Sequence, residues 1–362
     1  MLGLMCGDAL GMAVEGRPPV EIMRKHGMIR DLLPGSLPAG AYTDDTVTAG
    51  ALAESLVARR GFDPEDFAGR LAATYEARRG YGRGTREVIA RLATGVPWDQ
   101  AGKSVFGVGS FGNGAAMRVA PLGLLYHGDL EVAARLARLS AQVSHSHPLG
   151  QAGAAVQALA IALSLRAGIG GRPVADPAGL EPEGFLEEIE ARLEAKEGLF
   201  RERLETVALL LDREQAPDLD SGPREVLAWA ETVAGVLGND SRAFQSVPTA
   251  LYLFLSRRGN LEETLISAVA LGGDTDTIAA MAGALAGAYS GLEALPQRWI
   301  EGLEEGARGR RYIAGLADDL FLLWLEEHAD HANGDAALIN GRRTEFGADP
   351  PATQRPSEWD RG

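Results

Sequence analysis

The chain has 362 residues, 46% of them hydrophobic, and a formal net charge of −15. This composition permits a large buried core, while the acidic balance argues against a nucleic-acid-binding surface, which requires clustered Lys and Arg. Cys6 is the single cysteine, which excludes an intramolecular disulfide. Because no basic segment precedes a long apolar run near the N-terminus, we expect no signal peptide and a reducing, cytoplasmic compartment.

Helical periodicity dominates the chain. Apolar residues recur at three- and four-residue spacings, and alternating β-branched runs are nearly absent, so we expect an all-α fold. A helical pattern starts at the N-terminus (LGLMCGDALGMAVEG), and the other expected helices cover residues 45–60, 64–79, 85–94, 130–142, 149–167, 183–211, 223–237, 261–270 and 276–289. The charged segment 183–211 is expected to be a solvated surface helix or pair of helices. Residues 331–362 lack periodicity and are expected to form a flexible or loosely docked C-terminal tail.

Residues 271–291 combine an acidic start with a run almost free of charge. A membrane-spanning helix needs about 20 predominantly apolar residues. Here the apolar part begins only after Thr277, contains Gly283, Gly287 and Ser290, and lacks flanking basic residues. We therefore expect a buried helix whose small residues allow close helix contacts, and no membrane association.

Two short acidic segments each stand in front of an expected helix. In YTDDT, Thr43 can cap the helix, and Asp44 and Asp45 suit its first turn, because carboxylates favour the positive end of the helix dipole. GGDTDT, residues 272–277, has the same form, and its two glycines allow the chain to turn tightly. Helix capping explains each segment on its own, but buried carboxylates without a compensating partner are costly.

A metal site is the alternative explanation of the two acidic segments. Oxygen ligands without cysteine favour Mg²⁺ or Mn²⁺ over Zn²⁺. Two such clusters can converge on a centre with two ions about 4 Å apart. The residues alone leave capping and metal binding both open.

A glycine-rich segment, GVGSFGNGAAMRV, covers residues 107–119. Its glycines allow backbone N–H groups to form a concave anion site, and a helix behind them would add its dipole. This suits a phosphate or diphosphate, although the Lys-Ser/Thr ending of a P-loop is missing. A plain loop between helices is the other interpretation.

Three further polar residues need an explanation. In SHSHP, residues 144–148, either histidine can contact a ligand phosphate or serve as a structural hydrogen-bond partner. Glu15 ends an apolar helix, where it can be a solvated terminal residue or a movable general base. Asp8 is expected to be structural and bonded to backbone at a helix bend.

Together these residues resemble the ADP-ribosylglycohydrolase family, on the specific pairing of YTDDT with GGDTDTIA, and the resemblance covers about residues 2–325. Five further stretches resemble its serine-type branch, the third type, more closely than the arginine-type branch. These stretches are RGYG (79–82), GSFGNGAAMRVA (109–120), ARLSAQVSHSHPLG (137–150), FQSVPTALYLFL (244–255) and LGGDTDTIAAMAGALAGAY (271–289). The resemblance implies a compact single-domain orthogonal helical bundle over residues 1–330, with a binuclear metal site of two Mg²⁺ ions at its centre. We expect the protein to be a monomer.

The resemblance also implies roles for particular residues. The matches to the family's metal ligands are Thr43, Asp44, Asp45, Asp274, Asp276 and Thr277. The matches to the loop around diphosphate and adenosine are Gly109, Ser110, Phe111, Gly112, Asn113 and Gly114. Phe111 replaces a common tyrosine, and Phe106 lies near a second adenine-stacking position, in a loop one residue shorter. Glu15 matches a mobile gating glutamate, and His145 a histidine near the ligand.

The implied reaction is hydrolysis of the bond from C1″ of the distal ribose to its acceptor, in serine-linked ADP-ribose, O-acetyl-ADP-ribose or poly(ADP-ribose). Glu15 is the favoured acid/base, and Asp44, Asp45 and Asp276 complete the expected catalytic set, mainly as metal ligands. The expected partners are modified proteins or small ADP-ribose esters, with no direct nucleic-acid contact. An ADP-ribosyl-arginine hydrolase and a non-hydrolytic ADP-ribose-binding module are the alternatives.

Overall fold

The computed structural model describes residues 1–103, 105–169, 180–213 and 215–328. Over these residues the fold is all-α and contains no β-strand, which confirms the prediction from periodicity. The α-helices are α1 (Leu2–Gly11), α2 (Pro19–His26), α3 (Asp44–Arg59), α4 (Pro64–Ala73), α5 (Arg83–Ala93), α6 (Trp98–Ala101), α7 (Ala120–Leu125), α8 (Leu130–Gln142), α9 (Pro148–Ile169), α10 (Pro182–Glu190), α11 (Gly198–Arg213), α12 (Pro223–Leu237), α13 (Ala243–Ser256), α14 (Leu261–Ala270), α15 (Thr275–Ser290), α16 (Gln297–Gly302) and α17 (Arg310–Glu327). The expected tail, residues 331–362, lies outside the described residues.

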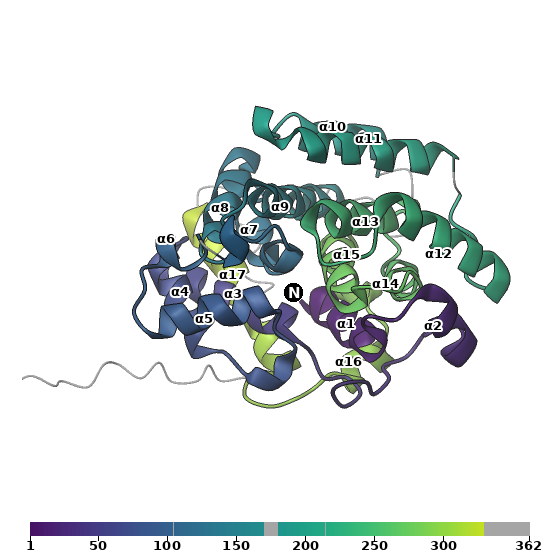
Figure 1. Ribbon diagram of the computed structural model, residues 1–362, viewed down its shortest axis with the longest axis horizontal. Helices are drawn as coiled ribbons and strands as arrows, with labels where there is room; N and C mark the ends of the chain where they lie inside the picture. Colours follow the sequence, from purple (N-terminus) through teal and green to yellow (C-terminus); the bar gives the residue numbers. More distant parts are fainter. Residues whose placement is uncertain (104, 170–179, 214, 329–362) are drawn as a thin grey trace, which may run out of the picture.

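Helices α1 and α15 lie in the middle of the molecule (Figure 1). Helices α3, α4 and α5 lie on one side of this pair, and α12 and α2 lie on the other, while α10 and α11 run along one edge. The arrangement brings the first and the last thirds of the sequence together at the centre.

Small residues allow α1 and α15 to pack unusually close. A Cβ added to Gly7 would lie 2.0 Å from the carbonyl oxygen of Ala279, and one added to Gly11 would lie 2.4 Å from that of Thr275. The hydroxyl of Thr275 donates to the carbonyl of Gly11 at 2.8 Å. The two helices are antiparallel, so the end of α1, which leads to Glu15, lies beside the start of α15. This close packing confirms the expected role of the small residues in the last third of the chain.

Some expected helices differ from the observed ones. The segment 64–79 is interrupted after α4 and resumes only as the short 3₁₀ helix η2 (Ala77–Arg79). The charged segment 183–211 forms the pair α10 and α11. Helix α13 is not among the expected helices. It contains Pro248, which removes one backbone donor but does not end the helix.

One helix among the described residues, spanning Pro148–Gly168, is long and apolar enough to cross a membrane by length and composition. Within this helix, 72% of the apolar window is buried by the rest of the fold, as in the core helix of a globular protein. Residues 271–291 do not meet the same criterion, in agreement with the sequence analysis.

Candidate active site

The first acidic cluster lies at the N-terminal end of α3, and Asp8 of α1 caps this end. The carboxylate of Asp8 accepts the N–H of Thr43 at 2.9 and 3.0 Å, the N–H of Thr46 at 3.1 Å and the hydroxyl of Thr46 at 2.6 Å. The expected side-chain cap by Thr43 is therefore wrong: its hydroxyl donates to Asp45 Oδ2 at 3.0 Å. Asp8 does bind backbone, as expected, but the backbone belongs to α3 and not to its own helix.

The second acidic cluster lies at the N-terminal end of α15, after a turn in which Gly272 and Gly273 have φ of 65° and 74°. Gly273 also fixes the chain that follows Glu15. Its carbonyl accepts the N–H of Gly16 at 2.7 Å, and its own N–H donates to the carbonyl of Arg17 at 2.9 Å. Glu15 is thereby placed beside the aspartates that follow Gly273.

The two acidic clusters meet. The hydroxyl of Thr277 lies 3.5 Å from Asp45 Oδ2, which joins the start of α15 to the start of α3. Glu15, Asp274 and Asp276 each have a carboxylate oxygen within 4.8 Å of the others. The structure thus brings together the residues that a metal centre between the clusters would require.

The buried, closely spaced carboxylates of this cluster favour the binding of a cation. Burial, and to a smaller extent the neighbouring carboxylates, raise the pKa values of Asp44, Asp45 and Asp276 well above their ordinary value. Asp45 Oδ1 is buried and has no hydrogen-bond partner among the described residues. Because an unpaired buried carboxylate is costly and the donors are all oxygen, the set fits a hard divalent cation such as Mg²⁺.

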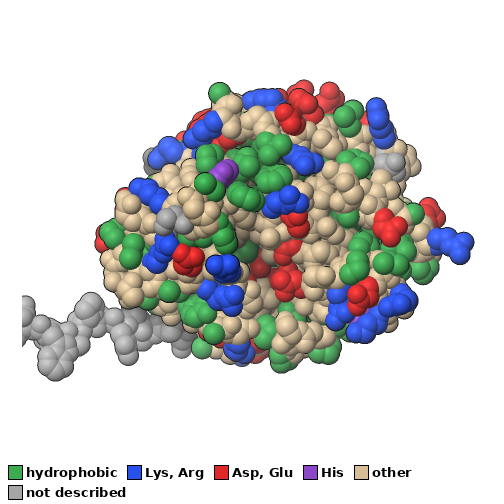
Figure 2. Space-filling model, viewed as in Figure 1, with side chains coloured by type: hydrophobic (Ala, Val, Ile, Leu, Met, Phe, Trp, Pro, Cys, Tyr) green, Lys and Arg blue, Asp and Glu red, His purple; other side chains and the backbone are tan. Residues whose placement is uncertain are grey.

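A cavity of about 430 Å³ opens beside the acidic cluster. Figure 2 shows acidic side chains gathered in a hollow near the centre of this face, with basic and hydrophobic side chains along its rim. The lining consists of Glu15, Asp44, Gly80, Gly82, Arg83, Gly84, Thr85, Phe106, Ser110, Phe111, Gly112, Asn113, Gly114, Met117, His145, Ser241, Arg242, Asp274, Asp276 and Thr277. Of the predicted site residues, Thr43, Asp45 and Gly109 are not part of this lining.

The glycine-rich segment forms one wall of the cavity and is fastened to the start of α13. Asn113 donates its backbone N–H to the carbonyl of Ser241 at 2.8 Å, and Ala243 donates to the carbonyl of Phe111 at 3.0 Å. The side-chain amide of Asn113 donates to Asp274 Oδ2 at 2.6 Å. The wall is therefore held against the second acidic cluster.

The expectation of a helix dipole behind this loop is wrong. Residues Asn113–Ala115 form only the 3₁₀ helix η4, and α7 does not begin until Ala120. Three residues add little dipole, so an anion at this wall would depend on individual N–H groups and side chains.

His145 and two phenylalanines border the same wall. His145 is buried behind Gly114, with Nδ1 2.8 Å from the hydroxyl of Ser144. Burial, and secondarily the charge of Arg118, lower the pKa of His145 to about 3, so its ring is neutral at neutral pH. Phe106 and Phe111 keep 57% and 38% of their surface exposed at the cavity, where they can contact a flat ring.

The sequence matches the ADP-ribosylglycohydrolase family over residues 1–330. The chain belongs to this family. It is 38% identical to the ADP-ribosylhydrolase ARH3 of Bos taurus, over 84% of this chain and 88% of the relative, and 36% identical to ARH3 of Homo sapiens, over 84% and 89%. A solved structure described as an ADP-ribosylglycohydrolase-related protein complex is similar at a TM-score of 0.64 and 32% identity, covering 89% of this chain and 95% of that one.

These similarities confirm the family resemblance and its ARH3-like, serine-type branch. An uncharacterized protein of Archaeoglobus fulgidus is also 38% identical, over 89% of this chain and 95% of its own length. Family membership identifies the chain as an enzyme, an ADP-ribosyl hydrolase.

Two parts of the cavity of this ADP-ribosylglycohydrolase were not assigned from the sequence. Arg83 and Thr85 line it from the start of α5, and Ser241 and Arg242 line it from the segment before α13. The glycines of RGYGRG, residues 79–84, were a signal for the first wall, because they precede a helix as the other site glycines do. The second wall has no comparable pattern and depends on the packing of α13.

Proposed function

We propose that this enzyme is a Mg²⁺-dependent hydrolase that releases ADP-ribose from serine-linked ADP-ribosyl groups, with O-acetyl-ADP-ribose and poly(ADP-ribose) as further substrates. One observation carries the proposal. Two acidic clusters from opposite ends of the chain, together with Glu15, converge at a cavity whose other wall is a glycine-rich loop. The similarity to ARH3 proteins supports the serine-type choice of substrate.

The residues that would hold two Mg²⁺ ions, for which Mn²⁺ is a fitting substitute, are Thr43, Asp44, Asp45, Asp274, Asp276 and Thr277. Support comes from the buried unpaired oxygen of Asp45 and from the all-oxygen donor set. When bound, Mg²⁺ supplies positive charge that orients the ribose hydroxyls and lowers the pKa of water.

Glu15 acts first as the general base and then as the general acid of the reaction. Water oxygen bonds to C1″, the bond from C1″ to the acceptor oxygen breaks, and that oxygen leaves with the bonding electrons. Glu15 takes the proton of the attacking water and returns one to the acceptor. Desolvation, and secondarily the charges of Asp274 and Asp8, raise the pKa of Glu15 above its ordinary value, which makes its carboxylate a stronger base toward the attacking water.

The wall from Gly109 to Gly114 binds the diphosphate and adenosine of the substrate. The N–H groups of Gly109, Gly112 and Asn113 donate within the protein, so the other N–H groups of this wall and the neutral His145 ring offer the hydrogen bonds to the diphosphate. Phe106 and Phe111 offer apolar faces for the adenine. Together these contacts bind the invariant part of the substrate and leave C1″ at the acidic end.

Release of free ADP-ribose tests the proposal. The enzyme is incubated with serine-linked and arginine-linked ADP-ribosyl peptides, O-acetyl-ADP-ribose and poly(ADP-ribose), each with Mg²⁺ and with EDTA. We expect release from the serine-linked peptide, loss of release in EDTA and recovery on adding Mg²⁺. Release from the arginine-linked peptide alone would overturn the substrate choice, and binding of ADP-ribose without any release would indicate a binding module.

A further inference from the structure

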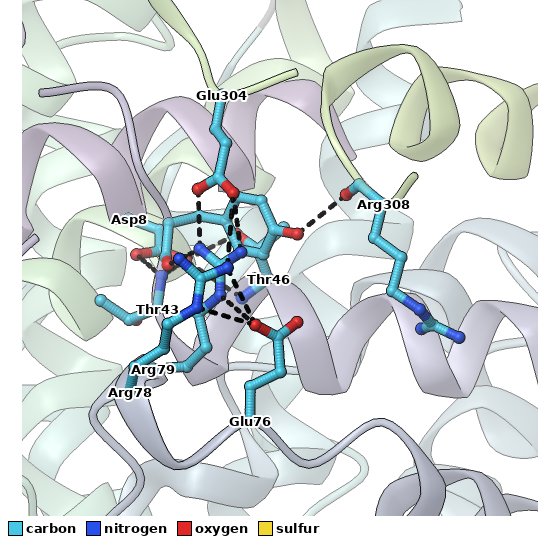
Figure 3. A network of polar contacts seen from close by, with 9 residues as sticks. Asp8, Thr43, Thr46, Glu76, Arg78, Arg79, Glu304 and Arg308 are labelled. Carbon is cyan, nitrogen blue, oxygen red and sulfur yellow. Dashed lines mark hydrogen bonds and ion pairs between the residues drawn. The ribbon is translucent and has the colours of Figure 1, made fainter. Parts of the chain in front are cut away.

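The peptide group between Tyr42 and Thr43 is held at both ends by buried ionic side chains (Figure 3). Its carbonyl accepts a hydrogen bond from Arg79 Nη1 at 2.7 Å. Its N–H donates to the carboxylate of Asp8 at 2.9 Å. This peptide lies one residue before Asp44 and leads directly into the N-cap residue Thr43, so its plane helps to set the direction in which the first acidic cluster enters the site.

Arg79 is itself fixed from a distant part of the chain. Glu304 accepts two hydrogen bonds from its guanidinium, from Nη1 and from Nη2, each at 2.8 Å and across 225 residues. The guanidinium lies 3.9 Å from the ring centre of Tyr42, whose hydroxyl donates to the carbonyl of Arg308 at 3.0 Å. A backbone hydrogen bond of 2.9 Å from Glu304 to the carbonyl of Gly40 closes the network. Figure 3 shows these groups converging on the segment in front of α3.

The same arginine also begins a wall of the cavity. Arg79 is followed directly by Gly80, which lines the cavity together with Gly82 and the start of α5. Neither Arg79 nor Glu304 is part of the lining. The pair therefore acts on the site through the backbone that it holds.

We infer that Arg79 and Glu304 are positioning residues that set the metal affinity of the site, an inference that rests on the proposed function. Arginine suits this task because its planar fork fixes both the carboxylate and the Tyr42 carbonyl in defined directions. Removal of residues that orient metal ligands typically lowers the metal affinity by about 10–100-fold.

Glu304→Gln tests this inference because it removes the negative charge that faces the guanidinium of Arg79 and leaves every proposed metal ligand in place. The matched control is Glu197→Gln, since Glu197 also forms a partly buried two-bond pair with an arginine, Arg138, at 2.9 and 2.7 Å. The backbone carbonyl that Arg138 bonds is that of Arg192, whereas Arg79 bonds the carbonyl of Tyr42 in front of α3. Mn²⁺ affinity is measured by calorimetry on the full chain, and the melting temperature is measured by circular dichroism.

We expect Glu304→Gln to weaken Mn²⁺ binding by about tenfold or more, and Arg79→Lys, which keeps the charge but loses the fork, to weaken it as well. Glu197→Gln is expected to lower the melting temperature but to leave the Mn²⁺ affinity within about twofold, because this ion pair does not hold the backbone in front of the ligands. Excess Mg²⁺ should restore turnover in Glu304→Gln at a temperature at which circular dichroism shows the variant to be folded without Mg²⁺, so that the recovery reports metal occupancy and not refolding.

Two results would overturn the inference: unchanged Mn²⁺ affinity in Glu304→Gln, or an equal loss in Glu197→Gln. If Glu304→Gln does not fold, Glu304→Asp, which keeps the charge but shortens the reach, provides the same comparison. Failure of the wild-type chain to bind Mn²⁺ would instead overturn the proposed function together with this inference, so the two failures are distinguishable.

Discussion

Asn113 and Asp274 are 161 residues apart in the chain, and the side-chain amide of Asn113 donates to Asp274 Oδ2 at 2.6 Å. The first residue belongs to the glycine-rich wall and the second to the acidic cluster. Burial raises the pKa of Asp274, and the hydrogen bond from Asn113 opposes this shift by favouring the charged form. The contact therefore joins the part of the cavity proposed for the diphosphate to the part proposed for the metal.

Asn113→Ala should impair both parts of the site. A hydrogen bond to a charged group contributes about 1.5–3 kcal/mol, so we expect turnover to fall by at least about tenfold, with weaker ADP-ribose binding. Steady-state kinetics and calorimetry with ADP-ribose measure the two effects. Ser246→Ala is the control, because it removes the other partner of the Asn113 amide, at 3.1 Å, and leaves Asp274 bonded. Equal losses in the two variants would show that the link to Asp274 has no special importance.

Glu15→Gln should separate proton transfer from metal binding. Removal of a general base typically costs about 10²–10⁴-fold in rate, so we expect turnover to fall by about 100-fold or more while Mn²⁺ affinity stays within about threefold. Asp276→Asn, at a proposed ligand, should lose both. Glu15 also lies within the 4.8 Å group of carboxylate oxygens. A loss of Mn²⁺ affinity in Glu15→Gln as large as in Asp276→Asn would therefore make Glu15 a ligand and not the base.

Much of the candidate site could be predicted from local sequence. Two carboxylates within three residues at the entrance of an apolar helix have few explanations, and such a pair occurs at Asp44 and Asp45 and again at Asp274 and Asp276. The helices were recognisable for the same local reason, since amphipathic spacing is a property of neighbouring residues.

The interactions that support the site could not be predicted in this way. Asp8 caps a helix whose N-cap residue, Thr43, lies 35 residues later, and Glu304 bonds Arg79 across 225 residues. Each depends on which helices pack together, which no local pattern records. Thr43 is a second example. It stands at the N-cap position, but Asp8 already accepts the N–H groups at the start of α3, and the hydroxyl of Thr43 donates to Asp45.

The raised pKa values of the acidic cluster predict that these carboxylates contribute less to stability as the pH rises. Asp44, Asp45 and Asp276 have folded-state pKa values well above their ordinary value, and that of Asp8 is raised to about 6. Between the unfolded and the folded pKa values, the native state binds more protons, so the free energy of unfolding falls as pH rises. In EDTA we therefore expect this cluster to stabilise the chain more at about pH 5 than at about pH 7.5, while the lowered pKa of His145 acts in the opposite direction.

Mg²⁺ should reverse this trend, because it binds the ionised carboxylates and stabilises the native state by mass action. Urea unfolding at both pH values, with EDTA and with Mg²⁺, provides the measurement. Asp276→Asn removes one of the ionising groups and should show a smaller pH slope and little response to Mg²⁺. The same pH slope with and without Mg²⁺ in the wild-type chain would contradict the cation-binding interpretation.

The close packing of α1 on α15 predicts that Gly7→Ala is severely destabilising. The added Cβ would lie 2.0 Å from the carbonyl oxygen of Ala279, and both helices would have to move apart because only backbone is in the way. Overpacking of this kind costs about 1–3 kcal/mol or more. The start of α15 carries Asp276, so we also expect weaker Mn²⁺ binding in the fraction that remains folded.

Gly69→Ala in α4 is the matched control, since no atom lies within 4 Å of its added Cβ, and helix propensity should stabilise this variant by up to about 1 kcal/mol. Urea unfolding of the two variants therefore separates helix propensity from helix contact, and equal stability changes would show that the α1–α15 contact tolerates a methyl group.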